Sequence, residues 1–293
     1  MLDARVDRAL LFRLATSDAF ERIVCRVPGG EARAWQAASR YVAGKSQERA
    51  LALSVELAQR GIGASLDFFG EQVRDPALAR SAVDGYVAVA GELVDLPAGV
   101  WLSLDLSHIG LDIDVSFCRS QLERIVKALP DGRLLQVGAE DAARTDRILE
   151  VILPLAVEGA PLGATLQANL RRSGQDAEQL ARAGLHIRLV KGAYVEGPDV
   201  ARPYGEETDL AYVRLAHILA GTGKRLALAT HDRPLREALL RALPEAECEL
   251  LLGVRGEDAE ELARRGRTVR LYVPFGEDWF RYWMRRLAES RGA

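Results

Sequence analysis

Eight short apolar runs, separated by segments with helical periodicity, constrain the fold of this sequence most strongly. The runs are Ala64–Phe68, Val100–Leu104, Arg133–Val137, Ala164–Gln167, Ile187–Val190, Arg225–Ala229, Cys248–Leu252 and Val269–Val273. Between them, residues 146–159 and 208–223 repeat apolar side chains at the spacing of an amphipathic helix. Eight strands that alternate with helices predict an α/β protein built as a (β/α)8 barrel of the TIM type. The chain of 293 residues is long enough for one such barrel and an extension.

Glycines stand near the start of several of these runs, where we expect them to end the preceding helices as C-caps. They are Gly61, Gly132, Gly163, Gly184, Gly223 and Gly266. The residues before the first strand have a helical pattern, and residues 46–61 form a good amphipathic helix. The predicted organisation is a helical segment of residues 1–60 packed on a (β/α)8 barrel domain of residues 61–293.

Other classes of protein fit less well. An open doubly wound sheet usually has a glycine-rich turn after its first strand, whereas here the first run continues into Phe69 and Gly70. Residues 221–224 read GTGK but precede a strand and lack the rest of a phosphate loop. The 39 basic and 42 acidic residues give a net charge of −3, which provides no reason to expect nucleic acid.

The cysteines and the hydrophobic runs indicate a cytoplasmic protein. Cys25, Cys118 and Cys248 are far apart and odd in number, which fits a reducing compartment and provides no metal-binding spacing. The first residues alternate charged and apolar side chains, unlike a signal peptide. No run reaches the ~18 apolar residues that a spanning helix needs.

Polar residues gather where the predicted strands end, which is where barrel enzymes place their active sites. They are Asp67, Glu71, Asp105, Ser107, His108, Glu140, Asp141, Gln167, Asn169, Arg171, Lys191, Tyr194, Thr230, His231, Asp232, Glu249 and Tyr272, with the apolar Leu251 beside them. Several have a structural alternative. Thr230 or Asp232 can cap the following helix, and Glu140 and Asp141 can complement a helix N-terminus. A single histidine such as His231 is more often structural than catalytic.

The last predicted helix, residues 276–290, combines aromatic and basic side chains. Trp279, Tyr282 and Arg286 follow a spacing of i, i+3 and i+7, and Arg285 lies beside them. One interpretation is an exposed basic helix end whose aromatic residues pack on the barrel. The other is a carboxylate clamp, because two guanidiniums can hold one carboxylate through forked hydrogen bonds.

Five motifs together resemble the bacterial proline dehydrogenases, which are flavoenzymes on a distorted (β/α)8 barrel. The motifs are SLDFFGE at 65–71, RLVKGAY at 188–194, ATHD at 229–232, LYVPFGEDW at 271–279 and YWMRRLAE at 282–289. They occur in the family's order, and the resemblance covers roughly residues 35–290. It implies a divergent monofunctional member that depends on FAD.

The resemblance implies a cofactor site around the fifth strand. Arg188, Val190, Lys191, Gly192 and Ala193 would line FAD, and glycine would let the backbone approach it closely. Three further residues, Gln167 near the flavin ring and Thr230 and His231 beside it, would also contact the cofactor. Glu249 stands where the family has a glutamine that meets the adenine.

The resemblance also implies a substrate pocket for a small amino acid. Arg285 and Arg286 would bind its carboxylate, and Glu71 would pair with Arg285 as a gate. The pocket walls would be Tyr194, Leu251, Tyr272 and Tyr282. The implied reaction is hydride transfer from L-proline to flavin N5, which yields 1-pyrroline-5-carboxylate. A quinone would accept the electrons, so the family implies at most a peripheral contact with the inner face of the cell membrane.

The sequence departs from the family pattern at the ends of the second and third strands. Asp105 stands where the family has a lysine that holds the substrate carboxylate, and Gly138 replaces the aspartate that pairs with it. A carboxylate beside the substrate carboxylate is unfavourable by on the order of 1–4 kcal/mol. The alternatives are therefore proline, a proline analogue or other modified amino acid, and a barrel without catalysis. The retained Glu71, Lys191, Arg285 and Arg286 argue against the last of these.

Overall fold

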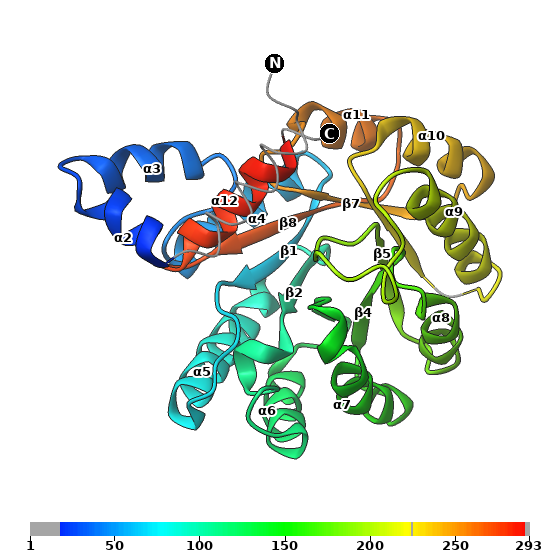
Figure 1. Cartoon of the computed structure of the whole chain (residues 1–293), viewed down its shortest axis with the longest axis horizontal. Coiled ribbons are helices and arrows are strands. Elements are labelled where there is room, and N and C mark those ends of the chain that lie inside the picture. Colours follow the sequence, from blue (N-terminus) through cyan, green and yellow to red (C-terminus); the bar gives the residue numbers. More distant parts are fainter. Residues whose placement is uncertain (1–17, 224, 291–293) are drawn as a thin grey trace.

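Eight parallel strands close into a barrel in the computed structural model, which describes residues 18–223 and 225–290 (Figure 1). The strands follow one another around the barrel in sequence order. They are β1 Gly63–Phe68, β2 Val100–Leu104, β3 Leu135–Val137, β4 Leu162–Gln167, β5 His186–Val190, β6 Leu226–Ala229, β7 Glu247–Leu251 and β8 Val269–Phe275. Each of the eight predicted runs overlaps one of these strands, so the prediction of a (β/α)8 barrel is confirmed.

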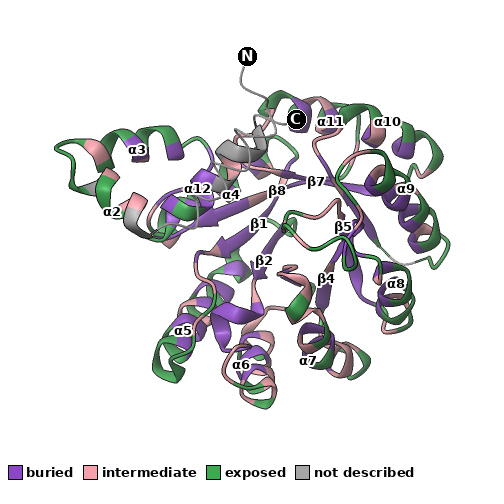
Figure 2. Ribbon diagram, in the orientation of Figure 1, coloured by how far each residue is buried: buried purple, intermediate pink, exposed green. Residues whose placement is uncertain are grey.

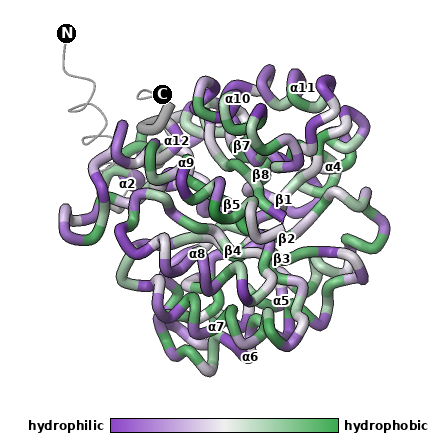
Figure 3. Tube along the Cα trace, turned by 90° about the vertical axis from the view of Figure 1, so that its right-hand side faces the viewer, coloured by the Kyte–Doolittle hydropathy of each residue, from purple (hydrophilic) through white to green (hydrophobic). Residues whose placement is uncertain are grey.

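Helices surround the barrel and alternate with its strands (Figure 1). They are α5 Pro76–Glu92, α6 Val115–Ala128, α7 Thr145–Val157, α8 Ser173–Arg182, α9 Glu206–Ala220, α10 Arg233–Ala242, α11 Gly256–Arg264 and α12 Trp279–Ser290. Three short 3-10 helices lie in the connections: η1 Leu93–Asp95, η2 Leu106–Ile109 and η3 Ala142–Arg144. Buried residues line the strands and the inner helix faces (Figure 2), and hydrophilic residues alternate with hydrophobic ones along the outer helices (Figure 3).

The glycine prediction is correct at four positions and wrong at two. Gly61, Gly184 and Gly266 have positive φ directly after the cap residue of a helix, and Gly223 has positive φ two residues after the cap of α9, in keeping with C-terminal capping turns. Gly132 lies in a separate turn, three residues after Leu129, which caps α6. Gly163 instead lies inside β4, and Gly159, with φ of 95°, ends the preceding helix. A Cβ at Gly163 would collide with the side-chain oxygen of Gln136. This glycine therefore makes room inside the barrel rather than in a turn.

The N-terminal helices belong to two hydrophobic clusters. Helix α4 (Gln47–Gln59) contributes Ala50 and Leu57 to the main core. Helices α2 (Asp18–Arg26) and α3 (Gly30–Ala38) form a hairpin beside α12, where Trp35 and Trp279 meet edge to face at 5.1 Å (Figure 1). The division of the chain at residue 60 stays a prediction. Helix α4, which precedes that boundary, packs in the same hydrophobic core as the strands. Residues 1–17 of the predicted segment lie outside the described residues.

No helix in the described part of the chain is long and apolar enough to cross a membrane. Within the same residues, no three His, Cys, Asp or Glu side chains gather in a way that could hold a metal ion. Two of the cysteines, Cys118 and Cys248, are buried as free thiols, and the side chain of Cys25 is outside the described set.

Candidate active site

Parallel pairing brings most of the predicted site residues to one end of the barrel. Asp67 of β1 lies opposite Ser103 of β2, and Leu251 of β7 lies opposite Tyr272 of β8. Gln167 of β4 is paired with Val190 of β5, from which the chain continues into Lys191 and Gly192. Residues that are far apart in sequence therefore meet at the carboxyl ends of the strands, as expected for a barrel site.

The end of β5 approaches the end of β4 through a glycine. Gly192 has φ of 116°, and a Cβ there would collide with the side-chain oxygen of Asn169. Asn169 is 6% exposed, and its Oδ1 has no hydrogen-bond partner among the described residues. The abrupt change from an apolar strand to Lys-Gly-Ala-Tyr thus has a steric reason. Only glycine fits between this backbone and the buried amide.

Replacing Gly192 with alanine should lower the free energy of unfolding by about 1–3 kcal/mol, because the left-handed backbone and the contact with Asn169 both oppose a side chain. Urea denaturation monitored by far-UV circular dichroism will measure the loss. Gly197 of the same loop is the matched control, because a Cβ there meets no atom within 4 Å. Equal stability of the G192A and G197A variants would show that the close approach is not needed.

Lys191 lies between two carboxylates. Its Nζ is 2.6 Å from Asp209 Oδ1 on α9 and 2.7 Å from Asp232 Oδ2 at the end of β6. Burial acts to lower the pKa of Lys191, but the hydrogen bonds to the two aspartates outweigh it and raise the pKa. Asp232 also accepts a hydrogen bond from the Leu235 N–H, so it caps α10 as one of the two alternatives predicted. The sequence had not indicated Asp209.

His231 is held as a neutral ring with a defined tautomer. Its Nε2 accepts the backbone N–H of Leu251 at 3.0 Å, so the proton of the neutral imidazole is on Nδ1. Burial lowers the pKa of His231 to about 4, which keeps the ring uncharged at neutral pH. Nδ1 is buried without a hydrogen-bond partner in the described residues. His231 therefore presents a donor that a cofactor acceptor could satisfy, while neighbouring Thr230 is 7% exposed.

An ion pair fills the barrel interior below this rim. Arg188 of β5 donates from Nε to Glu249 Oε2 of β7 at 2.5 Å and from a terminal nitrogen to Ser65 Oγ at 3.0 Å. Glu249 is 3% exposed, and His186 Nε2 lies 3.5 Å from its other oxygen. Burial alone would raise the pKa of Glu249, but Arg188 and His186 favour the ionised form and lower it to about 2.

Two aspartates occupy the ends of β1 and β2. Asp67 is 6% exposed, and burial raises its pKa to about 7, although the hydroxyls of Ser103 and Tyr272 and the charge of Arg188 oppose the shift. Asp105 extends toward β3, where its Oδ1 occupies the position that a Cβ of Gly138 would take. The missing side chain on β3 thus makes room for a carboxylate that comes from β2.

Aromatic rings connect the terminal helix to the barrel rim. Tyr282 of α12 is 5% exposed, and its ring lies 5.2 Å from Phe69 and 6.0 Å from Tyr272. Arg286 is half-buried, with its guanidinium carbon 5.0 Å from the centre of the Tyr282 ring. The predicted packing of the aromatic residues on the barrel is therefore present, and Arg286 stacks on them. The side chain of Arg285 lies outside the described residues.

The remaining predicted residues lie around the same rim. Gln167 is 5% exposed and donates from Nε2 to the carbonyl of Glu140 at 2.9 Å. Glu71, Val190, Tyr194 and Leu251 are half-buried, and Ala193 is exposed. The rim therefore offers partly accessible side chains above a closed, charged interior.

Comparison with known proteins places this arrangement in a family. The sequence profile described as proline dehydrogenase matches residues 50–293. The chain belongs to the proline dehydrogenase family. It is 31% identical over 260 residues to proline dehydrogenase 1 of Bacillus subtilis subsp. natto, with 86% of each chain covered. It is also 32% identical over 269 residues to the proline dehydrogenase of Deinococcus radiodurans, with 87% of each covered.

Solved structures share the barrel of this proline dehydrogenase family member. Proline utilization A of Bdellovibrio bacteriovorus, inactivated by N-propargylglycine, superposes with a TM-score of 0.84 at 19% identity over 98% of this chain. A proline utilization A variant of Bradyrhizobium japonicum gives 0.74 at 25% identity over 93%. The matched region is 36% and 33% of those longer chains, respectively. The protein is thus an oxidoreductase of this family whose sequence corresponds to about a third of the larger proteins.

The rim fits the flavin that the family implies. The Nδ1–H of His231 and the side-chain oxygen of Asn169 are buried polar groups without partners in the described residues, as a missing ligand would leave them. Gly192 lets the backbone after β5 lie directly against this amide oxygen. A donor after β6 and an acceptor after β4 are therefore available to a ligand at this end of the barrel.

Proposed function

We propose that this protein is an FAD-dependent dehydrogenase that oxidises L-proline to 1-pyrroline-5-carboxylate. Its membership of the proline dehydrogenase family over residues 50–293 carries the proposal. When bound, FAD supplies the redox chemistry by accepting a hydride from the carbon next to the amine. The protein's own part is to bind, orient and shield the substrate.

The proposed cofactor site uses the ends of β4, β5 and β6. Lys191, Gly192 and Ala193 line it together with Val190, and Gln167, Thr230 and His231 face it. Arg188 supplies positive charge from the barrel interior. Glu249 does not contact the cofactor and acts through its ion pair with Arg188, whose charge it partly offsets. This role differs from the adenine contact that the family pattern suggests for Glu249, because the carboxylate is bound inside the barrel.

The proposed substrate pocket lies between the rim and α12. Arg286 binds the substrate carboxylate with Arg285, and Tyr282 packs on the ring of the amino acid. Tyr194, Leu251 and Tyr272 wall the pocket, and Glu71 closes it as the gate. The substrate nitrogen binds without its extra proton, because its lone pair assists loss of the hydride.

A second candidate substrate is a proline analogue or another modified amino acid. The observation that favours it is Asp105, whose carboxylate fills the space over Gly138 where the family has a lysine and an aspartate. A substrate with a hydrogen-bond donor at this position would gain an interaction with Asp105 that proline cannot make. The two candidates use the same flavin chemistry.

Anaerobic titration of the purified protein tests both candidates. The protein should show the visible absorption of a bound flavin, and L-proline should bleach it. A panel of hydroxylated, aminated and acyclic amino acids then ranks the substrates by the rate of bleaching. A colourless preparation that does not take up added FAD would overturn the proposal, and faster bleaching by an analogue would favour the second candidate.

We propose a quinone as the electron acceptor and a cytoplasmic protein with at most peripheral contact with the inner face of the membrane. No nucleic acid and no metal enter the proposed function. Steady-state reduction of a short-chain quinone by the substrate, with and without vesicles, tests the acceptor and the contact together.

A further inference from the structure

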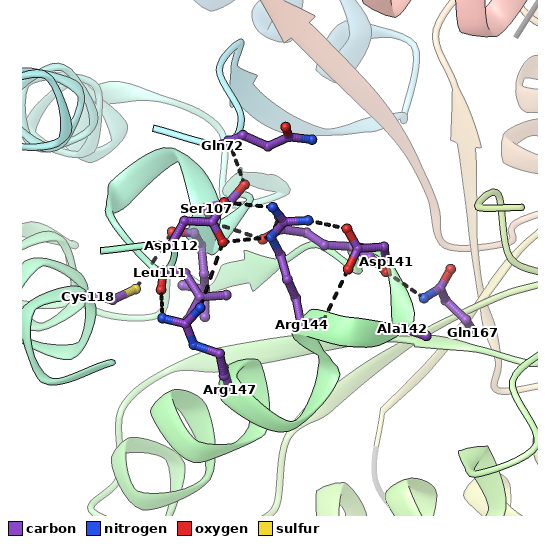
Figure 4. Close-up of polar contacts among 12 residues, drawn as sticks. Gln72, Ser107, Leu111, Asp112, Cys118, Asp141, Ala142, Arg144, Arg147 and Gln167 are labelled. Carbon is purple, nitrogen blue, oxygen red and sulfur yellow. Dashed lines mark hydrogen bonds and ion pairs between the residues drawn. The ribbon is translucent and has the colours of Figure 1, made fainter. Parts of the chain in front are cut away.

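A fully buried serine holds the segment that follows Glu71. Ser107, in η2, is 0% exposed. Its Oγ accepts the backbone N–H of Gln72 at 3.0 Å (Figure 4), and its carbonyl accepts that of Val73 at 2.9 Å. Gln72 has φ of 58°, a left-handed conformation that is uncommon outside glycine. These two hydrogen bonds therefore fix the backbone directly after the proposed gate residue.

Glu140, in the loop between β3 and α7, holds this serine. The carboxylate of Glu140 is 4% exposed, and its Oε1 accepts the Ser107 N–H at 2.9 Å. Arg144 lies 3.6 Å from the other oxygen and is itself anchored to Asp112 through hydrogen bonds of 2.6 and 2.9 Å (Figure 4). Burial raises the pKa of Glu140, and the hydrogen bonds from Ser107 oppose this shift.

The same loop holds two other segments of the proposed site. The carbonyl of Glu140 accepts the side-chain amide of Gln167 at 2.9 Å, which fixes the orientation of that amide (Figure 4). The backbone N–H of Ala142 donates to Glu196 Oε1 at 2.8 Å. Glu196 lies two residues after Tyr194, so this hydrogen bond fixes the loop that carries the tyrosine.

We propose that the loop from Glu140 to Ala142 positions the three rim residues Glu71, Gln167 and Tyr194 with respect to one another. Glu140 is a positioning residue because it acts through Ser107 and Gln167 and needs no contact with the substrate. Glu196 is a second positioning residue and acts on Tyr194 alone. The inference rests on the proposed function, which assigns Glu71 and Tyr194 to the substrate and Gln167 to the flavin.

Substitutions of the two positioning residues should have different effects on the FAD-loaded enzyme. Glu140 acts on Glu71 and Gln167, whereas Glu196 acts on Tyr194 alone. The E140A variant should lose about ten- to a hundredfold in kcat/KM, because it removes a buried, charged hydrogen-bond acceptor from the Ser107 N–H. Its flavin absorption band should also shift, because loss of the carboxylate releases the loop whose backbone carbonyl, at Glu140, holds the Gln167 amide. The E140Q variant keeps an oxygen for the Ser107 N–H, so it should stay within about threefold of wild type. E196A should raise KM for the substrate about fivefold and leave the flavin spectrum and kcat unchanged.

Glu150, an exposed carboxylate on α7, provides the matched control, and E150A should behave as wild type. Binding of a proline analogue with an ether oxygen in place of the ring nitrogen, followed by the flavin spectrum, measures the substrate site without turnover. If E140A does not fold, S107A still tests the positioning of Glu71, and E196A still tests the positioning of Tyr194. Variants at 107, 140 and 196 that match E150A in KM and spectrum would refute the positioning role. Failure of the wild-type protein to bind flavin or oxidise any substrate would instead refute the proposed function.

Discussion

Replacing Arg286 with alanine should lower kcat/KM for the amino-acid substrate about 100- to 1,000-fold, because a forked, charge-assisted pair with a carboxylate contributes about 3–4 kcal/mol. The geometry supports this expectation, since the guanidinium stacks on Tyr282, which itself lies against Tyr272 at the rim. R286K should recover only a small part of the loss, because an ammonium cannot form the fork. Steady-state kinetics with each variant at equal flavin occupancy will measure the effect.

Arg281 on the same helix provides the control for Arg286. Its side chain is 44% exposed and lies 3.8 Å from Glu21 of α2. R281A should therefore change kcat/KM less than about twofold, since exposed ion pairs contribute little. A mild effect of R286A, similar to that of R281A, would mean that the carboxylate is bound elsewhere. The helix end would then be the exposed basic terminus that the sequence pattern also allowed.

The barrel was predictable because local sequence patterns mark each strand, and the strands follow one another around the barrel in sequence order. Each apolar run marks one strand, and sequential parallel strands must bring their carboxyl ends to one side. Thr230, His231 and Lys191 could therefore be placed at one rim before any contact was known. The error at Gly163 shows the limit of local reasoning. The pattern recognised a glycine near a strand, but the side chain of Gln136 on the neighbouring strand decides why glycine is needed.

The contacts between strands could not be predicted from the sequence. Asp105 and Gly138 compensate for each other in space, whereas the sequence indicated only that both halves of the family's ion pair are missing and that the local charge is reversed. Glu140 and Glu196 bind backbone N–H groups, which every residue except proline carries, so no partner residue type marks these hydrogen bonds. Asp209 reaches Lys191 from α9, and its position in a helix first turn had a simpler explanation. Such contacts between distant residues depend on the register in which the neighbouring strands pair.

Glu249 should be among the side chains on which stability depends most. E249A should lower the free energy of unfolding by about 3–5 kcal/mol, because it leaves the buried Arg188 charge without its carboxylate. E249Q should cost less, since its amide oxygen still accepts from Arg188. Urea denaturation of the flavin-free protein separates this loss from any effect of the cofactor.

The pH dependence of stability shows whether the Glu249 carboxylate is the cause of this loss. Arg188 and His186 lower the pKa of Glu249 to about 2 in the folded protein, so folding favours the ionised form. Its contribution is present above the ordinary glutamate pKa of about 4.3 and is lost as the pH falls through about 2. The stability difference between wild type and E249Q should therefore narrow below pH 4. Glu237, which pairs with Arg265 on the surface at 2.9 Å, is the control, and E237A should cost less than about 1 kcal/mol. Equal losses for E249A and E237A would show that the interior pair does not stabilise the barrel more than a surface pair does.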